Sequence, residues 1–245
     1  MRIGILSDIH GNLEALEASL NFLKNKADFI VSMGDVVGYG PDPENCAEII
    51  SEQALVMTMG NHEESLIRKD FSGLRETARI SLEWTAKNLS PACMEKLNGW
   101  PVKAEKEGAT FVHASLSKPL HRYLTRNKEA EEEFPLLEGE LCFIGHTHMP
   151  GGFMQDVSTG KIETIFPDFG GGMKLAMDDG HRYIVNVGSV GQPRDGFPFA
   201  CAAIYDKDKK LVTIHRLEYP LEKTRCKIIE KGLPSVLAKR IMQGI

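Results

Sequence analysis

Six short apolar runs in the sequence each end just before a loop that carries histidine, aspartate, asparagine or serine. The runs are GIL, FIVSM, LVMTM, TFV, LCFI and YIVNV, and helical patterns separate the first three. Alternation of strand and helix predicts βαβ units and a parallel sheet in the N-terminal half of the chain. Because the carboxyl ends of parallel strands lie at one edge of a sheet, we expect the polar residues after the runs to gather there.

Amphipathic patterns predict the helices. After Gly11, with acidic residues early and basic residues late, apolar residues recur at Leu13, Leu16, Leu20 and Leu23. This pattern is typical of a helix whose charges match its dipole. Further helices are predicted over 41–53, 72–100, 127–139 and 232–245. From about residue 160 the strands follow one another through Gly and Asp turns, as in antiparallel hairpins. The simplest interpretation is one α/β domain, residues 1–245, with two sheets.

Composition limits the classes of protein to which the chain can belong. The 245 residues are 42% hydrophobic and carry a net charge of −5, which is ordinary for a globular protein. This charge speaks against broad binding of nucleic acids or anionic membranes. No run reaches membrane-spanning length, and the first is too short for a signal peptide. The five cysteines have no paired spacing, so we expect a cytoplasmic protein. The oligomeric state stays open, with a homo-oligomer as one alternative.

The histidines are concentrated after the apolar runs. Four positions after each of six runs make 24, where chance expects fewer than one of the eight histidines. Those positions hold His10, His62, His113, His146 and His148. In an extended segment His146 and His148, two residues apart, would point to the same side. Two adjacent imidazoles repel each other when protonated, so a bound metal that keeps both neutral explains the pair.

Asp8, Asp35 and Asn61 follow the same runs and add oxygen ligands. Imidazole, carboxylate and carbonyl ligands together suit Mn, Fe, Co, Ni or Zn, and the lack of a thiolate speaks against a structural zinc site. The ligands are too many for one ion, and a carboxylate such as Asp35 can bridge two. Two divalent ions with two carboxylates and a hydroxide keep a charge of about +1, which favours a phosphate ester as substrate.

In chain order the motifs are D-x-H, G-D, G-N-H-E, a lone histidine and G-H-x-H. This series resembles that of the calcineurin-like metallophosphoesterases, and the resemblance extends over nearly the whole chain. GDVVGYGPDP, NVGSVGQPRDG and the C-terminal GLP helix are similar to the small prokaryotic members. The resemblance implies a two-sheet β-sandwich flanked by helices. It also implies two divalent metal ions, of which manganese is the first expectation.

The resemblance further implies which side chains bind each ion. The ligands of the first ion would be Asp8, His10, Asp35 and His148. Those of the second would be Asp35, Asn61, His113 and His146. Asp35 therefore bridges the ions, and the two histidines of G-H-x-H bind different ones. His62 would be no ligand but would stabilise or protonate the leaving oxygen while a hydroxide bridging the metals attacks phosphorus in line.

Three further residues are candidates for substrate binding. Asn12 and Tyr39 would line the pocket, although Asn12 is equally consistent with a helix start and Tyr39 with a loop cover. Arg194 follows a strand end, where it would receive a phosphate or form a surface salt bridge. Ser/Thr protein phosphatases carry an arginine in the loop that here reads Gly38, Tyr39 and Gly40, so a phosphoprotein substrate is disfavoured.

We therefore expect a small phosphorylated substrate, either a phosphodiester or a nucleotide-like compound. One alternative is an asymmetric hydrolase of dinucleoside polyphosphates. Another is a non-catalytic scaffold, because the small subunit of the retromer coat resembles this fold and acts by binding partners. The presence of His62 together with all seven ligand positions speaks against a scaffold.

Overall fold

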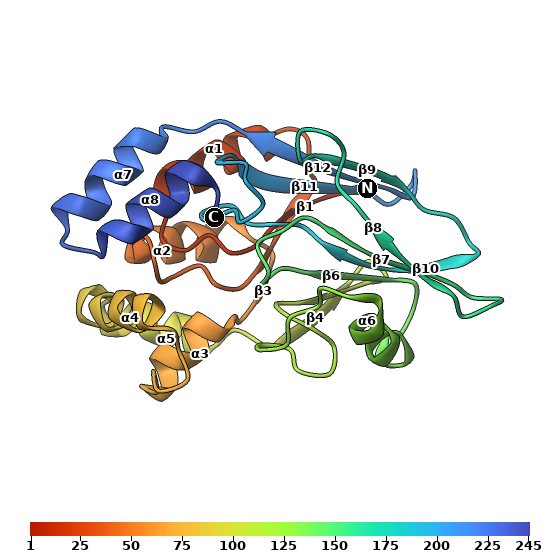
Figure 1. Ribbon diagram of the computed structural model, residues 1–245, viewed down its shortest axis with the longest axis horizontal. Helices are drawn as coiled ribbons and strands as arrows, with labels where there is room; N and C mark the ends of the chain where they lie inside the picture. Colours follow the sequence, from red (N-terminus) through yellow and green to blue (C-terminus); the bar gives the residue numbers. More distant parts are fainter.

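Two mixed six-stranded sheets face each other in the computed structural model, which describes residues 1–245, and helices cover their outer faces (Figure 1). The first sheet has the order β3-β2-β1-β11-β12-β9. Its strands are β1 (Arg2–Leu6), β2 (Phe29–Met33), β3 (Val56–Thr58), β9 (Met173–Ala176), β11 (Ala200–Asp206) and β12 (Leu211–Leu217). The second has the order β4-β5-β6-β10-β7-β8. Its strands are β4 (Lys103–Lys106), β5 (Ala109–Val112), β6 (Leu141–Ile144), β7 (Gly151–Asp156), β8 (Ile162–Ile165) and β10 (His181–Asn186).

The parallel part of each sheet consists of the strands that the six apolar runs predict. In the first sheet β2 pairs in parallel with β1 and β3, and in the second β6 pairs in parallel with β5 and β10. All other pairings are antiparallel. The predicted two-sheet sandwich flanked by helices is confirmed.

The helices are mostly those that the sequence predicts. They are α1 (Leu13–Leu23), α2 (Pro43–Gln53), α3 (Asn61–Arg68), α4 (Glu76–Asn88), α5 (Pro91–Asn98), α6 (Asn127–Glu133), the 3-10 turn η1 (Phe134–Leu136), α7 (Leu221–Glu230) and α8 (Ser235–Gln243). α1 packs on β11 and β12, and α6 packs on β8. No helix has both the length and the apolar character needed to cross a membrane.

Two helical predictions need correction. The single helix expected over 72–100 is two helices, because Pro91 lacks the N–H that a continuing helix needs and instead starts α5. Ser90 caps this second helix by accepting a hydrogen bond from the N–H of Cys93. Two helices, α3 and α7, were not predicted; in α7 only Thr224 and Ile228 are buried, so that its apolar periodicity is weak.

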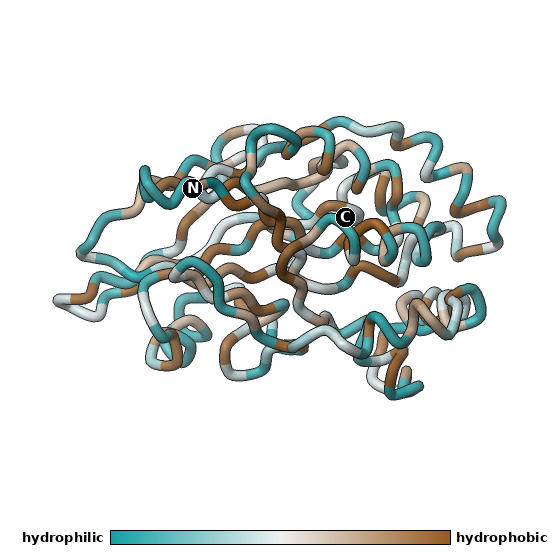
Figure 2. The backbone as a smooth tube through the Cα atoms, turned by 180° about the vertical axis from the view of Figure 1, so that it is seen from behind, coloured by the Kyte–Doolittle hydropathy of each residue, from teal (hydrophilic) through white to brown (hydrophobic).

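The main core between the sheets is made of side chains from both. Phe111 of β5 stacks on Phe143 of β6 with ring centroids 5.5 Å apart, and Tyr205 of β11 lies 5.7 Å from Phe143 across the sandwich. Figure 2 shows apolar residues concentrated along the central strands, with hydrophilic residues along the outer loops. This contact between the sheets holds their parallel strands side by side.

Replacing the central aromatic ring should lower stability strongly. Phe143→Ala leaves a cavity between the sheets, and we expect it to reduce the free energy of unfolding by about 3–5 kcal/mol. Phe169→Ala is the matched control, because Phe169 is fully exposed and should change stability by less than about 0.5 kcal/mol. Urea unfolding followed by circular dichroism measures both. Equal losses in the two variants would contradict this view of the core.

Candidate metal centre

The loops at the carboxyl ends of the parallel strands are joined by hydrogen bonds. The N–H of Asp8 donates to the carbonyl of Gly34 at 3.1 Å, which joins the loops after β1 and β2. The N–H of Gly145 donates to the carbonyl of His113 at 2.8 Å, which joins those after β6 and β5. Between the two sheets, the N–H of His146 donates to Asp8 Oδ2 at 2.9 Å. The predicted gathering of polar residues at one edge therefore occurs in both sheets.

Most of the predicted ligands have a left-handed backbone conformation. The φ angles of Asp8, His10, Asp35, His146 and His148 lie between 49° and 64°. Such angles are uncommon for residues other than glycine, although Asp and His adopt them more readily than most, and they cluster at functional sites. The assumption that His146 and His148 lie in an extended segment is therefore wrong. The turn separates their side chains instead of setting them on the same side.

Glycines make room for the ligand loops at two places. A Cβ atom on Gly145 would lie 2.0 Å from Ser7 Oγ and 2.4 Å from Asp8 Oδ2. A Cβ atom on Gly38, whose φ is 84°, would lie 2.1 Å from His62 Nδ1. No side chain fits at either position without displacing a residue of the site. The glycines of G-H-x-H and of the GDVVGYG segment are thus required by close approach.

One group of ligand atoms consists of Asp8, His10 and His148. His10 Nε2 lies 3.1 Å from His148 Nε2, and His148 Nε2 lies 3.2 Å from Asp8 Oδ1. The Nδ1 atoms of both rings donate to backbone carbonyls, that of His10 to Val37 at 3.1 Å and that of His148 to Gln192 at 2.6 Å. Each neutral ring therefore turns the lone pair of its Nε2 atom toward the other group members.

The second group consists of Asp35, Asn61, His113 and His146. His113 Nε2 lies 3.1 Å from both Asn61 Oδ1 and His146 Nδ1, and 3.4 Å from Asp35 Oδ2. His113 Nδ1 hydrogen-bonds to the carbonyl of Met33 at 2.8 Å, so its Nε2 lone pair also faces the group. Asp35 Oδ2 lies 3.7 Å from His10 Nε2 of the first group. Asp35 is therefore shared by the two groups.

The two groups have the chemistry of a cation site. Nitrogen lone pairs and carboxylate oxygens, all acceptors, face one another, and the buried Asp8 Oδ1 has no hydrogen-bond partner. In each of the sets Asp8–His10–His148 and Asp35–His113–His146, the ligand atoms lie within 4.8 Å of one another. Acceptors at this spacing repel unless a cation lies between them. The seven residues fit divalent metal ions.

Burial and the neighbouring charges shift the pKa values of the candidate ligands. Burial lowers the pKa of His10, and it lowers the pKa of His146 to about 3, so both rings stay neutral and able to bind metal. Burial also disfavours the protonated form of His113, but Asp35 outweighs it and raises the pKa of His113 to about 10, so without metal this ring carries a proton that a bound cation would displace. Burial opposes ionisation of Asp35, yet nearby imidazoles, that of His113 first, hold its pKa well below the ordinary value. The site therefore attracts positive charge.

His62 lies beside the two groups. It begins α3 with Asn61, and its backbone N–H donates to Asp35 Oδ1 at 2.9 Å. Its Nε2 atom lies 3.9 Å from Asp35 Oδ2, and its buried Nδ1 atom has no hydrogen-bond partner. Burial lowers the pKa of its ring. Nδ1 faces Gly38, so Nε2, on the side of Asp35, is the nitrogen suited to hydrogen bonding with a substrate at the cluster.

Glu63 holds the loops that carry Asp35 and Asn61. Its carboxylate accepts four backbone N–H groups, from Asp35, Val36 and Gly60 at 2.8 Å and from Val37 at 3.2 Å. Burial and the charge of Asp35 raise the pKa of Glu63 to about 7, although these donors favour its charged form. Glu63 is the last residue of the G-N-H-E motif, but this role was not predicted, because it depends on contacts with the distant loop after β2.

The three candidate substrate-binding residues differ in their surroundings. Asn12 is buried; its Oδ1 accepts from the N–H of Ala15 at the start of α1, and its Nδ2 donates to the carbonyl of Gly191. These bonds favour the helix start over a role in the pocket. The ring of Tyr39 lies 4.7 Å from those of both His10 and His62.

The third candidate, Arg194, and a tyrosine that was not predicted also lie next to the cluster. The guanidinium of Arg194 lies 5.8 Å from the ring of Tyr39, which leaves Arg194 as a candidate for phosphate binding. Tyr123, which the sequence analysis missed, lies half exposed with its ring 4.1 Å from that of His146. The sequence contains no signal for Tyr123, because it lies in a loop without periodicity.

Comparisons with known proteins find related sequences and structures. The family model of calcineurin-like phosphoesterases matches residues 1–170. An uncharacterized protein of Methanocaldococcus jannaschii is 32% identical over 99% of this chain and 98% of its own length. The crystal structure of a metallophosphoesterase from Sphaerobacter thermophilus is 38% identical, covers 100% of this chain and 99% of that one, and has a TM-score of 0.90. A hypothetical protein from Pyrococcus horikoshii, 20% identical over 100% of this chain and 98% of that one, shares the fold with a TM-score of 0.80.

Removing the charge of Glu63 should loosen the ligand loops. In Glu63→Gln an amide NH₂ faces N–H donors, so we expect a loss of about 3 kcal/mol of stability and weaker metal binding. Thermal unfolding with and without Mn²⁺ measures both effects. Glu64→Gln is the control, because Glu64 forms its ion pairs with Arg68 and His121 outside the cluster. Unchanged stability and metal response in Glu63→Gln would contradict the role given to Glu63.

Proposed function

This chain belongs to the calcineurin-like phosphoesterase family, and from this premise we propose that it is a binuclear metallohydrolase of phosphodiesters or nucleotide-like phosphate esters. The observation that carries the proposal is the meeting of seven ligand side chains from two sheets, with His62 at their edge. A structural metal site would need neither the shared carboxylate of Asp35 nor a free imidazole beside it.

The residues of each group would hold one ion. Asp8, His10 and His148 would bind the first, Asn61, His113 and His146 the second, and Asp35 both. When bound, divalent ions would lower the pKa of a coordinated water toward ~7 and polarise the phosphoryl oxygens. Manganese is the first expectation, since mixed nitrogen and oxygen ligands suit it as they suit Fe, Co, Ni and Zn.

The other residues of the site would act on the substrate directly. Arg194 would receive a phosphoryl oxygen, because its guanidinium is a charged donor next to the cluster. His62 would hydrogen-bond or protonate the leaving oxygen, and its contact with Tyr39 keeps the ring in position. Asp8 and Asp35 supply two negative charges against four positive ones, so a phosphate ester, which is an anion, is attracted to the site.

The partner that we propose is therefore a small phosphorylated compound. A dinucleoside polyphosphate cleaved asymmetrically is a special case of the same chemistry, and product analysis distinguishes it. The scaffold alternative is disfavoured, because a protein that only binds partners has no use for His62 beside the cluster.

Hydrolysis assays test the proposal. Protein stripped of metal by a chelator should not hydrolyse bis-p-nitrophenyl phosphate, and added Mn²⁺ should restore turnover above that of the monoester p-nitrophenyl phosphate. His62→Ala should lower the rate by about 10²–10⁴-fold, as loss of a proton donor does. His181→Ala is the control, because His181 pairs with Asp178 away from the cluster. Metal binding without turnover of either ester would favour the scaffold.

Metal analysis tests the shared ligand. Elemental analysis after dialysis against Mn²⁺ should find two ions per chain in the wild type. Asp35→Asn should lower occupancy of both positions, whereas Asp8→Asn should mainly affect one. Metal at ~100 times its dissociation constant should stabilise the wild type by ~2.7 kcal/mol. Asp168→Asn, which changes an exposed aspartate, should match the wild type in occupancy and stability.

A further inference from the structure

A cavity of about 290 Å³ adjoins the candidate metal centre on the side of the G-H-T-H loop. Thr147, which lies between the candidate ligands His146 and His148, is part of its wall, together with Ile144 at the end of β6. The volume is close to the ~300 Å³ at the lower end of the range for small-molecule sites. A phosphate ester bound at the metal centre has this space next to it.

Most of the cavity wall is apolar. Leu124 and Phe153 are buried in it, and Phe166 and Met149 line it with side chains that are 76% and 41% exposed. A large aromatic side chain exposed at the entrance of an apolar cavity is suited to stacking on a planar ligand. The phosphate of the substrate would not bind here, because the wall has no free cation.

The cavity also contains an acceptor without a donor. Asp195 lines it, and one of its carboxylate oxygens, Oδ2, pairs with Arg216. The other, Oδ1, is buried and has no hydrogen-bond partner. Arg216 is fixed in turn by its hydrogen bond to the carbonyl of Gly171 at 2.8 Å. A ligand with an N–H group would supply the missing donor at Oδ1.

Two segments border both the metal centre and the cavity. In the first, the ring of Tyr123 lies on His146 while the next residue, Leu124, lines the cavity. In the second, Arg194 lies next to Tyr39 at the metal centre, and the next residue, Asp195, lines the cavity. A ligand that spans the two sites would thus meet a cation at its phosphate and an acceptor at its organic part.

We propose that this cavity binds the base of a nucleotide-type substrate, a planar ring with an exocyclic amino group that donates to Asp195 Oδ1. The inference rests on the proposed function and names the substrate class of the same site. Phe166 and Leu124 contact the faces of the ring, and the phosphate lies at the metal centre. Asp195 and Phe166 are therefore specificity residues rather than catalytic ones.

Binding of nucleosides tests the cavity apart from catalysis. Titration of metal-stripped protein with adenosine, guanosine, cytidine and purine riboside, followed by calorimetry or ligand-observed NMR, gives the affinities. We expect at least one amino-bearing nucleoside to bind about tenfold more tightly than purine riboside, which lacks the amino group, as loss of a hydrogen bond to a charged group predicts. Asp195→Asn should remove this preference, and Phe166→Ala should weaken the binding of all the nucleosides.

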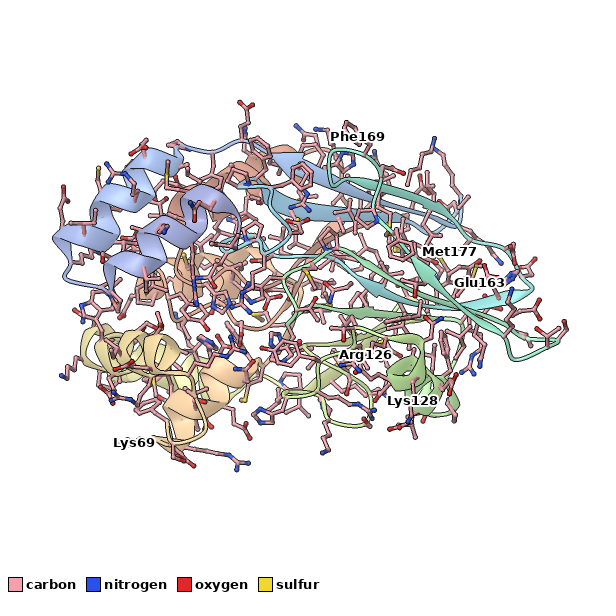
Figure 3. The ribbon with its side chains drawn as sticks, viewed as in Figure 1. Lys69, Arg126, Lys128, Glu163, Phe169 and Met177 are labelled. Atoms are coloured by element: carbon pink, nitrogen blue, oxygen red, sulfur yellow. The ribbon has the colours of Figure 1, made fainter.

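Phe169→Ala is the matched control for Phe166→Ala. Phe169 belongs to the same β8–β9 loop and is labelled in Figure 3, at the outside of that loop, but it does not line the cavity. The Phe169→Ala variant should bind nucleosides as the wild type does. Thermal unfolding verifies that Asp195→Asn is folded, and Phe166 is too exposed for its truncation to unfold the chain.

Kinetics of the Mn²⁺-loaded enzyme provide the second readout. Phe166→Ala should raise KM about tenfold for the p-nitrophenyl ester of a nucleoside 5′-phosphate and leave KM for methyl p-nitrophenyl phosphate unchanged. Absence of nucleoside binding, or binding that neither variant affects, would overturn the inference while leaving the His62→Ala result intact. Conversely, nucleoside binding without any hydrolysis would support the assignment of the cavity as a base-binding site and overturn the proposed function.

Discussion

The repulsion between buried acceptors at the candidate metal centre is the constraint on which the rest of the structure depends. The imidazoles of His10, His113 and His148 each give one N–H to a backbone carbonyl and turn the other nitrogen toward a carboxylate or a second ring. This arrangement is unfavourable without a cation, so the surrounding chain must hold it before metal binds. The two-sheet core, the hydrogen bonds between loops and the carboxylate of Glu63 supply that support. The centre is therefore a preorganised site rather than one that metal assembles.

The position of the candidate ligands depends on the parallel strands of the two sheets. Parallel strands place their carboxyl ends at one edge, and two such sheets packed face to face bring two of these edges together. Asp8 and Asp35 come from the first sheet, and His113 and His146 from the second, so neither sheet alone has the complete ligand set. The hydrogen bond from the N–H of His146 to Asp8 fixes the distance between the two halves. Metal binding should therefore depend on the packing of the two sheets against each other.

The sequence predicts this part of the molecule well because the signal is local. Each candidate ligand follows an apolar run within a few residues, and each run forms a strand that pairs in parallel with at least one other run. What could not be predicted depends on contacts between distant segments. The contact of Tyr123 with His146 and the role of Asp195 beside the cavity arise only when loops far apart in the chain meet. The backbone at His146 and His148 was predicted wrongly for a different reason, because the candidate metal ligands adopt φ angles that are uncommon for residues other than glycine.

The residues proposed to contact the substrate come from both sides of the boundary at residue 170. The match to the family model ends at residue 170, and every proposed metal ligand lies before it. Arg194 and Asp195 lie beyond it, in a segment held by α8, since the N–H of Gly196 donates to the carbonyl of Gly244 just after that helix. The packing of α7 and α8 on Tyr39 ties the same C-terminal region to the ring beside His62. Residues beyond the family match, Asp195 among them, thus join Phe166 and Leu124, which lie within it, around the cavity proposed for the organic part of the substrate.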